Sequence, residues 1–472
     1  MARVPARLPA LLAAPPNGET PLRLTNARLI DGTGAAPRDG ASVLIRDGRI
    51  EAVDSGAGSA GEPSARGADA APGADAAPGA GSAGEPSARV ANAAPGAGSA
   101  SEPSARVATV DLGGRTLMPG LIDAHAHVLA KLPRPAEGAE PLLPGTGAHV
   151  VAAHLAEALR RGVTTIRDVG SYGSVVVEAR QAMRLAAFRG PRLLTCGRIV
   201  SATSPGGRFF DGMYREADGP DDVRRAVREQ LRHGADYIKV MTTGARSVEL
   251  EDPDPAQLTR AEIAALVEEA HRLGYRVAAH AEGLPGTEIA IEEGIDTIEH
   301  GMYLNQRPDL LERMATQEQV LVPTLSCFYG VAGLDGDGAP GTWSPLLADL
   351  ARHNLEQAGR TLTAARDAGV KIALGHDWNP FYDSARELER MIHHGLPAMD
   401  ALVAATANGA FALGLGDQLG TVRPGMLADL LVVDGDPLSD PGVLRRRERI
   451  WLVVQLGEPV AGAALEASLP VS

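Results

Sequence analysis

A histidine pair in the first third of the chain has the spacing of a metal site. The segment from Met118 to Val128 reads MPGLIDAHAHV, and its short apolar run after a Pro-Gly turn predicts a β-strand. Side chains alternate between the two faces of a strand, so Asp123, His125 and His127 would project to the same side. Two imidazoles on one face can hold one ion, but His-x-His pairs also occur in strands that bind nothing. The function of this pair therefore depends on partners elsewhere in the chain.

Four further residues with metal-binding potential follow apolar stretches later in the sequence. They are Lys239 in YIKVMTTG, His280 in VAAHAEG, His300 in TIEHG and Asp377 in ALGHD. Each has a structural alternative, because a histidine can be hydrogen-bonded in the core, a lysine can reach the surface and an aspartate can cap a helix. Their shared position, each at the end of a predicted strand, favours one common metal site over unrelated structural roles.

Eight predicted strands would bring these side chains together. From Pro119 the sequence alternates short apolar stretches with amphipathic helices, which is typical of βα units. The predicted strands cover residues 119–127, 163–169, 192–200, 235–242, 275–281, 295–300, 320–325 and 370–376. In one unit, Asp221 would cap a helix that Gly234 ends. Thr259 and Glu262 would then form a capping box that opens the next helix. Eight such units predict an α/β fold with a closed (β/α)8 TIM-like barrel, whose active site lies at the carboxyl ends of the strands.

Strand patterns also occur on both sides of the predicted barrel. Residues 21–118 alternate apolar and polar side chains around Asp-Gly turns, and a similar pattern returns over 421–472, after a barrel that spans 119–420. We expect the two flanking segments to form one small composite β-sandwich domain. Residues 1–20 and the Ala/Gly/Pro/Ser-rich insert 55–106 are expected to be disordered, since the insert has almost no large apolar side chains to bury. A tolerated surface loop is favoured over a functional tether for the insert.

Composition limits the partners of the chain. It has 472 residues, of which 44% are hydrophobic, as in a soluble globular protein. Its 45 Lys and Arg against 59 Asp and Glu give a net charge of -14, which disfavours nucleic acids and anionic membranes as partners. Cys196 and Cys327 do not suggest a disulfide framework, and no segment has the length and apolarity of a membrane span. We expect a cytoplasmic protein that acts on a small molecule, and homo-oligomerisation is left open.

A lysine among the metal ligands requires an explanation. The ammonium group of Lys239 has no lone pair to offer a cation. Reaction with carbon dioxide would convert the amine to a carbamate, whose two oxygens could bridge two divalent ions. The other ligands would then divide into two groups, with His125, His127 and Asp377 around one ion and His280 and His300 around the other. Imidazole and carboxylate ligands favour zinc, with manganese and iron as alternatives.

The order of these short motifs is that of one enzyme superfamily. The motifs HAH, IKV, HAEG, IEHG and GHD, together with LGTVRPGMLADLLVVDGDP near the end of the chain, resemble the amidohydrolase superfamily, in the branch of imidazolonepropionase-like enzymes and metal-dependent Xaa-Pro dipeptidases. The resemblance implies a distorted (β/α)8 barrel with a flanking β domain, and it implies that Lys239 is the carbamylated bridge of a binuclear centre. It also implies hydrolysis of a carbon–nitrogen bond, in a non-peptide amide, a cyclic amide or a dipeptide, by a hydroxide that bridges the metal ions. Asp377 would accept the proton of the attacking water and pass it to the leaving nitrogen.

Two residues next to the ligands are candidates to support them. Asp123 shares a face with His125 and His127 but lies deeper, so we expect it to contact an imidazole, with a buried structural role as the alternative. His376 precedes Asp377 where the family more often has a small hydroxyl residue. It would either support the neighbouring ligand or fill space.

Several residues in the loops after the strands are candidates for substrate binding, namely Arg208, Phe209, Tyr214, Glu282, Tyr329 and Trp378. Aromatic residues make up 3% of the chain, and those in these loops would grip an apolar part of the substrate or, alternatively, pack the loops together. Glu282 and Arg208 stand where dipeptidases similar to this chain often have tyrosine and histidine. Arg208 could clamp a carboxylate through its planar guanidinium, whereas Glu282 would favour a cationic or hydrogen-bond-donating group.

Two other functions are consistent with parts of this pattern. A mononuclear deaminase or cyclic-amide hydrolase would use His125, His127, His280 and Asp377, but it would have no need of Lys239. A non-catalytic scaffold is the least favoured interpretation, because the set of potential ligands is complete.

Overall fold

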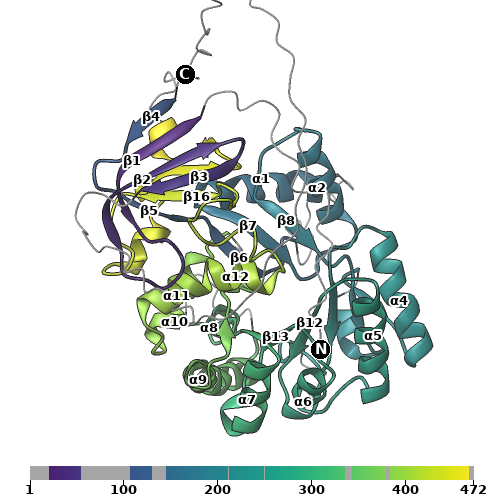
Figure 1. The fold of residues 1–472 in the computed structure, drawn as a ribbon. Coiled ribbons are helices and arrows are strands. Elements are labelled where there is room, and N and C mark those ends of the chain that lie inside the picture. Colours follow the sequence, from purple (N-terminus) through teal and green to yellow (C-terminus); the bar gives the residue numbers. More distant parts are fainter. Residues whose placement is uncertain are drawn as a thin grey trace, which may run out of the picture.

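Strands from the two ends of the chain form one sheet, and strands of the central region form two parallel sheets (Figure 1). The computed structural model describes residues 21–54, 107–129, 145–210, 212–248, 250–334, 343–378 and 382–466. The segments 1–20 and 55–106, for which the sequence predicts disorder, lie outside the described residues.

The first sheet has eight strands and combines both ends of the chain. Its strands are β1 (Leu22–Leu29), β2 (Arg38–Arg46), β3 (Arg49–Asp54), β4 (Ala108–Asp111), β5 (Thr116–Pro119), β16 (Leu430–Val433), β17 (Ile450–Gln455) and β18 (Glu458–Ala461). Strands β2 and β3 form an antiparallel hairpin, and both residues of its turn have positive φ, 50° at Asp47 and 74° at Gly48, as an Asp-Gly turn predicts. Strand β16 pairs antiparallel with β5. Strands from the two ends of the chain are therefore paired in one sheet.

The strands of the central region are parallel to one another. One sheet has three strands, β6 (Leu121–Ala126), β7 (Val163–Asp168) and β8 (Arg192–Thr195). The other has seven, in the order β10 (Tyr214–Glu216), β9 (Ile199–Ser201), β11 (Ile238–Met241), β12 (Val277–Ala281), β13 (Thr297–His300), β14 (Val320–Val322) and β15 (Lys371–Ile372). Each of the eight predicted strands is found, but 192–200 is divided between β8 and β9.

The two parallel sheets are not one continuous sheet in the part of the chain that the structure describes. They meet beside β6, where the Ala124 N–H donates to the carbonyl of Leu374 at 2.8 Å and the Asp377 N–H donates to the carbonyl of His125 at 2.9 Å. These bonds place the segment after β15 against the strand that carries the histidine pair. Gly375 makes this approach possible, since a Cβ there would lie 2.5 Å from that of His125.

Helices cover the parallel strands. The α-helices are α1 (Thr146–Arg160), α2 (Val175–Arg184), α3 (Pro205–Phe209), α4 (Pro220–Arg232), α5 (Arg260–Arg272), α6 (Leu284–Glu292), α7 (Pro308–Thr316), α8 (Leu325–Val331), α9 (Pro345–Asp367), α10 (Ala385–His393), α11 (Ala398–Ala404), α12 (Ala407–Ala412) and α13 (Ala463–Glu466). Short 3-10 helices are η2 (Leu304–Gln306), η3 (Pro441–Arg445) and η4 (Arg447–Arg449). None of the described helices is long and apolar enough to cross a membrane.

The starts of two helices test the predicted caps. The capping box of Thr259 and Glu262 is present at the start of α5, so this prediction is confirmed. The prediction that Asp221 caps α4 is wrong, because the N-cap is Gly219 and Pro220 occupies the first helical position. Proline is favoured there because it lacks the N–H that would remain unpaired. Asp221 instead lies in the first turn, where its charge complements the helix dipole.

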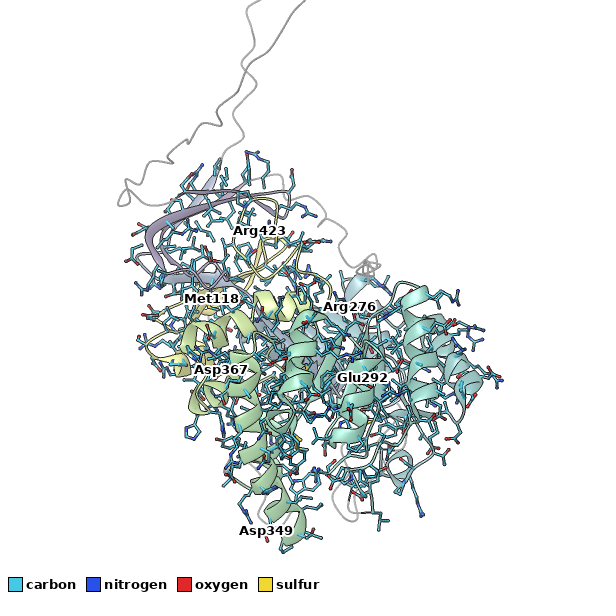
Figure 2. The ribbon with its side chains drawn as sticks, turned by 60° about the horizontal axis from the view of Figure 1, so that its bottom comes forward. Met118, Arg276, Glu292, Asp349, Asp367 and Arg423 are labelled. Carbon is cyan, nitrogen blue, oxygen red and sulfur yellow. The ribbon has the colours of Figure 1, made fainter. Side chains whose placement is uncertain are left out.

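The parallel sheets and the mixed sheet each bury a hydrophobic cluster of their own. Side chains of the parallel strands are almost entirely buried, as in Ile166 of β7 and Ile238 of β11, because helices cover the outside of these strands. The mixed sheet buries its own cluster, which includes Leu24 and Val432. Figure 2 shows Met118 between the mixed sheet and the helical part of the molecule. The chain thus passes from β5 of the mixed sheet directly into β6, at the edge of the candidate site.

Candidate active site

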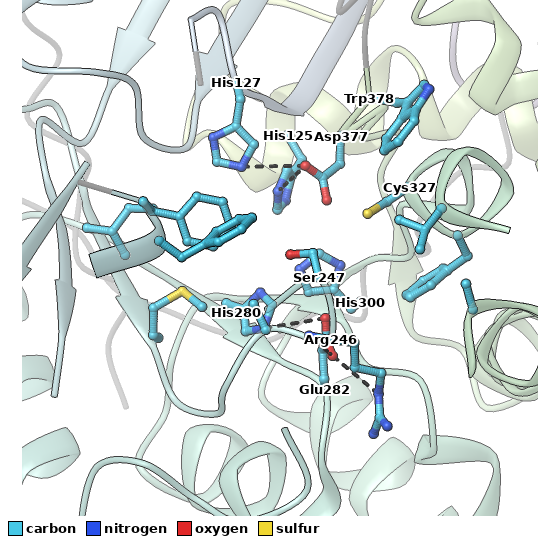
Figure 3. Close-up of a pocket in the computed structure, with 18 of the residues that line it drawn as sticks. His125, His127, Arg246, Ser247, His280, Glu282, His300, Cys327, Asp377 and Trp378 are labelled. Carbon is cyan, nitrogen blue, oxygen red and sulfur yellow. Dashed lines mark hydrogen bonds and ion pairs between the residues drawn. The ribbon is translucent and has the colours of Figure 1, made fainter. Parts of the chain in front are cut away.

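The six predicted metal ligands line one cavity beside the parallel strands. The cavity has a volume of about 320 Å³, and the six residues are His125, His127, Lys239, His280, His300 and Asp377. Figure 3 shows His125, His127, His280, His300 and Asp377 directed into this cavity. Asp377 Oδ1 lies 3.5 Å from Nε2 of both His125 and His127. The ring centroids of His280 and His300 are 4.5 Å apart. The structure therefore brings together residues from four strands, β6, β11, β12 and β13, and from the segments that follow β6 and β15, while their roles as ligands stay predictions.

Backbone carbonyls fix the orientation of two of the imidazoles. His127 Nδ1 donates to the carbonyl of Gly170 at 2.5 Å, and His280 Nε2 donates to the carbonyl of Gly244 at 3.1 Å. A carbonyl can only accept, so in a neutral ring the proton lies on the bonded nitrogen and the other nitrogen keeps its lone pair. His127 can therefore bind a cation through Nε2, and His280 through Nδ1.

Side chains fix the other two imidazoles. His125 Nδ1 lies 2.6 Å from Glu299 Oε2, and His300 Nδ1 lies 2.6 Å from Thr324 Oγ1. The Thr324 hydroxyl donates its proton to the carbonyl of Pro323, so it accepts from His300. Both rings thereby keep Nε2 for a cation. Such partners of the distal nitrogen are typical of histidines that bind metals.

Glu299 is a supporting residue that the sequence analysis missed. It is fully buried, and its second oxygen accepts from Arg167 Nη2 at 2.8 Å and from the Thr297 hydroxyl at 2.6 Å. Burial raises the pKa of Glu299, but the Arg167 charge and the His125 hydrogen bond outweigh it and hold the pKa well below its usual range. A glutamate next to His300 within an apolar strand was the available signal, since a buried charge needs a partner.

Asp123 has a different role from the expected one. Its Oδ1 accepts from the backbone N–H groups of His125 at 3.0 Å and His376 at 3.2 Å, and its Oδ2 accepts from the Ser384 hydroxyl at 2.6 Å. The expected contact with an imidazole ring is not found among the described residues, and the contacts agree with the alternative that the sequence offered, a buried structural role. Asp123 instead joins the two backbone segments that carry His125 and Asp377. Burial raises the pKa of Asp123 to about 6.

His376 lies beside the site but does not line the cavity. Its side chain is buried, and neither ring nitrogen has a hydrogen-bond partner within the described ranges. Burial lowers the pKa of His376 to about 3. The backbone N–H of His376, bonded to Asp123, is the part of the residue that supports the site.

Lys239 is the group that most clearly requires a further partner. Its side chain is 2% exposed, and Nζ makes no hydrogen bond to any described residue. Burial lowers the pKa of Lys239. A buried amino group without a partner is costly, so this position fits a lysine that is modified or that faces a bound group.

The backbone is strained at three positions around the cavity. His300, Thr324 and Asp377 have φ values of 70°, 50° and 45°, in the left-handed region that non-glycine residues rarely adopt. Each such residue costs on the order of 1 kcal/mol, and strain of this kind gathers at functional sites. Two of the three carry predicted ligands.

The donor set of the cavity fits divalent metal ions. Ligand atoms lie within 4.8 Å of one another in two groups, His125 with His300 and Asp377, and His280 with Glu282 and His300. Imidazole nitrogen and carboxylate oxygen are the ligands that zinc and related ions take in hydrolases. His300 belongs to both groups, so the two groups of ligand atoms are adjacent in the cavity.

Four of the predicted substrate-binding residues line the cavity, and two do not. Phe209, Tyr214, Glu282 and Trp378 belong to the lining. Arg208 is exposed on α3 and lies outside the lining. Tyr329 on α8 also lies outside it, and its hydroxyl is 3.1 Å from Nε2 of His394. Both residues sit on short helices, where neighbouring side chains point in different directions, so Phe328 faces the cavity and Tyr329 does not.

The cavity has two apolar walls on either side of the imidazole cluster (Figure 3). One wall comes from the segment around α3 and consists of Phe209, Phe210, Met213 and Tyr214. The other comes from α8, α9 and the loop after β15 and consists of Phe328, Val331, Trp343, Leu347 and Trp378. Gly330 allows the second wall to close, because a Cβ there would lie 2.0 Å from the Trp378 ring.

Glu282 lies at the edge of the imidazole cluster with a charged partner behind it. Its Oε1 is 3.5 Å from His280 Nε2, and its Oε2 accepts from the Arg246 backbone N–H at 3.1 Å. Burial raises the pKa of Glu282 to about 8, although the Arg246 charge acts in the opposite direction. Arg246 was missed in the sequence, where nothing in GARS distinguishes it from a surface residue.

Comparisons with known proteins agree with this site. The amidohydrolase family pattern matches residues 116–460. Ochratoxinase from Aspergillus niger is 31% identical over 376 residues, which cover 74% of this chain and 76% of that protein. Imidazolonepropionase from Salinispora tropica is 29% identical, over 69% of this chain and 79% of that protein. The crystal structure of a Xaa-Pro dipeptidase with bound methionine is 26% identical, with a TM-score of 0.76 over 94% of this chain and 100% of that one.

The chain belongs to the amidohydrolase family. It is an enzyme that hydrolyses carbon–nitrogen bonds other than standard peptide bonds, and the proteins to which it is similar are themselves named as hydrolases of this kind. The resemblance to imidazolonepropionase-like enzymes and Xaa-Pro dipeptidases is thereby confirmed, and the fold is the α/β, TIM-barrel type of these neighbours.

Proposed function

We propose that this enzyme hydrolyses amides with apolar groups on both sides of the scissile bond, at a centre of two zinc ions. The observation that carries the proposal is Lys239, whose buried amino group faces four imidazoles and a carboxylate without a hydrogen-bond partner among the described residues. A carbamate formed from Lys239 and carbon dioxide would supply the anionic bridge that such a centre needs.

The other ligands divide as the two halves of the cavity do. His125, His127 and Asp377 would hold one ion, and His280 with His300 would hold the other. The free nitrogens left by the hydrogen bonds, Nε2 on three rings and Nδ1 on His280, leave all four imidazoles able to bind an ion. Bound zinc would lower the pKa of a water molecule and polarise the substrate carbonyl.

Asp377 would act as the proton carrier. Its Oδ1 lies within 3.5 Å of His125 and His127, and their charges hold the pKa of Asp377 well below its usual range although burial raises it. An ionised Oδ1 can accept a proton from the attacking water and return it to the leaving nitrogen. The apolar walls would exclude bulk water and hold the two ends of the substrate.

The finer description of the fold is also a proposal. We propose that the two parallel sheets act as one distorted (β/α)8 barrel over 119–420. The mixed sheet would be a composite β-sandwich domain made from 21–118 and 421–472. The hydrogen bonds between β6 and the segment after β15 support the barrel. The free Cys196 and Cys327 support a reducing, cytoplasmic location.

The test of this proposal compares two lysine variants of the zinc-supplemented enzyme. A panel of N-acyl amines, dipeptides and cyclic amides first identifies a substrate. Lys239→Ala should then lose at least about 100-fold in kcat/KM, and short carboxylic acids should restore part of it by replacing the carbamate. Lys371→Ala, whose side chain is 38% exposed and paired with Glu318, should behave as wild type. One ion per chain and an indifferent Lys239 would contradict the proposal and favour the mononuclear alternative.

A further inference from the structure

We infer that Glu282 and Arg246 determine the charge selectivity of the cavity, so that the enzyme prefers amides with a hydrogen-bond donor, and no carboxylate, beside the scissile bond. This inference rests on the proposed function, because it concerns substrates of the same site. It names a substrate class that excludes free dipeptides and N-acyl amino acids.

The two oxygens of Glu282 face different surroundings. Oε1 points toward the imidazoles, 3.5 Å from His280 Nε2, and this ring nitrogen already donates to the carbonyl of Gly244. Oε2 is held by the backbone N–H of Arg246 and lies 3.3 Å from its Nε. Glu282 is therefore fixed from behind, and Oε1 is the oxygen presented to a ligand in the cavity.

The guanidinium of Arg246 is directed away from the imidazole cluster, with the Glu282 carboxyl group between them (Figure 3). Arg246 Nη2 donates to Asp254 Oδ1 at 2.5 Å, and the guanidinium lies 5.5 Å from the centre of the Tyr303 ring. The Arg246 side chain is 9% exposed. Its charge is thus balanced by two acidic residues and does not form a site for a substrate carboxylate.

The remaining cavity lining offers no replacement cation within the described residues. Its other basic side chain is Lys239, whose amino group lies among the imidazoles and would be anionic as a carbamate. Arg208, which the sequence suggested as a carboxylate clamp, is exposed and outside the lining. The other polar residues of the lining include Ser247 and the imidazoles, of which His280 lies 3.5 Å from Glu282 Oε1.

These contacts define a preference by chemistry. Whether protonated or ionised, the Glu282 carboxyl group can accept a hydrogen bond and brings no positive charge. A substrate N–H or ammonium beside Glu282 would gain a partner. A substrate carboxylate at the same position would lose its hydration and face another carboxyl group, because the neighbouring cation, Arg246, is already paired with Glu282 and Asp254. With apolar walls on both sides, the favoured substrates are arylalkyl amides that bear an amine or amide N–H.

The experiment uses the zinc-loaded wild-type enzyme and three probes that differ in one group. N-benzoylphenylalanine carries a carboxylate, N-benzoylphenethylamine carries hydrogen, and 2-N-benzoyl-3-phenylpropane-1,2-diamine carries an aminomethyl group at the same carbon. We expect kcat/KM to rise in that order, by at least about tenfold from the carboxylate to the aminomethyl probe. Fastest hydrolysis of the carboxylate probe, or equal rates for all three, would overturn the inference and leave the proposed function intact. Hydrolysis of none of them would overturn both.

Two variants test whether Glu282 is responsible for the preference between the aminomethyl and carboxylate probes. Glu282→Gln should reduce the ratio between the aminomethyl and carboxylate probes by at least about fivefold, because it removes the acidic group between Arg246 and the cavity. Glu268→Gln is the matched control, since Glu268 is 66% exposed, pairs with Arg224 and lies outside the cavity lining. The control should keep the order and the ratio of the wild type. An unchanged ratio in Glu282→Gln would contradict the assignment to Glu282.

Discussion

The two halves of the active site are supported by different kinds of contact. In the half that carries His125 and His127, buried charges from remote strands hold His125, through Glu299 and its ion pair with Arg167, while His127 donates to the carbonyl of Gly170. In the half that carries His280 and His300, neutral acceptors hold the imidazoles, and the charged pair of Glu282 and Arg246 lies at the cavity surface.

Because of this difference, we expect the two halves to affect different properties, the stability of the fold in one case and the choice of substrate in the other. A charge buried with its partners is expensive to disturb, so the His125 half should be rigid and sensitive to substitution. A charged pair at the cavity surface can exchange contacts with a ligand at lower cost. We therefore expect substitutions in the first half to change metal binding and stability, and substitutions in the second half to change which substrates are accepted.

The largest loss of activity should come from substitution of Asp377, which would serve both as a metal ligand and as the proton carrier. Asp377→Asn would remove a metal ligand and the proton carrier together, so kcat/KM should fall by about 1,000-fold. Metal analysis of the same variant should show loss of the ion in the His125 half. Asp367→Asn at the end of α9, with a side chain 74% exposed, is the control and should leave both quantities unchanged. A loss of less than tenfold in Asp377→Asn would remove this residue from the mechanism.

The next largest effect is expected from residues that hold an imidazole in place. The test compares Glu299, which bonds to His125, with Thr324, which bonds to His300. Glu299→Gln would leave the Arg167 charge buried without its partner, so it should weaken zinc binding by about 10- to 100-fold and destabilise the fold by about 3 kcal/mol. Thr324→Val, which removes a neutral acceptor from His300, should cost less on both measures. Zinc competition with a chelator and thermal unfolding would measure them. Equal losses in the two variants would refute the distinction between the halves.

A smaller effect is expected at the apolar wall. Trp378→Ala should raise KM by about tenfold for substrates with large apolar groups and little for small ones, because the indole forms part of the wall beside α8. Trp451→Ala in the mixed sheet is the control for loss of an indole elsewhere. Equal changes in KM for large and small substrates would indicate that Trp378 merely packs the loop.

The smallest effect on catalysis should come from His376, which influences acid stability instead. The pKa of His376 is lowered to about 3 by burial, so below pH 6.5 the unfolded chain binds a proton that the folded protein does not. Stability is therefore lost as pH falls from about 6.5 toward 3, with a slope of about 1.4 kcal/mol per pH unit for this group. His376→Leu should remove that contribution and change kcat/KM less than threefold. Urea unfolding of the metal-free proteins at pH 7, 6 and 5 would measure the slopes, and identical slopes would contradict the assignment.

The candidate metal ligands could be predicted because each depends only on the short sequence segment around it. His125 and His127 are neighbours on one strand, and His280, His300 and Asp377 each close a short apolar stretch, so the strand pattern alone placed them on one rim. The supports could not be predicted in this way. Glu299 is 174 residues from His125, and their contact depends on which strands face each other across the site.

Loop side chains were harder still, because short helices decide their direction. No local pattern distinguishes Phe209, which lines the cavity, from Arg208 on the same helix, α3, which lies outside the lining. Asp123 shows a related limit. Its position on the ligand face was predicted from strand alternation, but its carboxylate bonds to backbone N–H groups that adjacent segments bring close.

The most direct test of the account is anomalous diffraction at the zinc edge from crystals of the zinc-loaded enzyme. We expect two zinc peaks in the cavity. One should be bound by His125, His127 and Asp377, the other by His280 and His300, with carbamate density on Lys239 Nζ between them. A single peak with an unmodified Lys239, or zinc held elsewhere, would contradict the binuclear centre on which the proposed function depends.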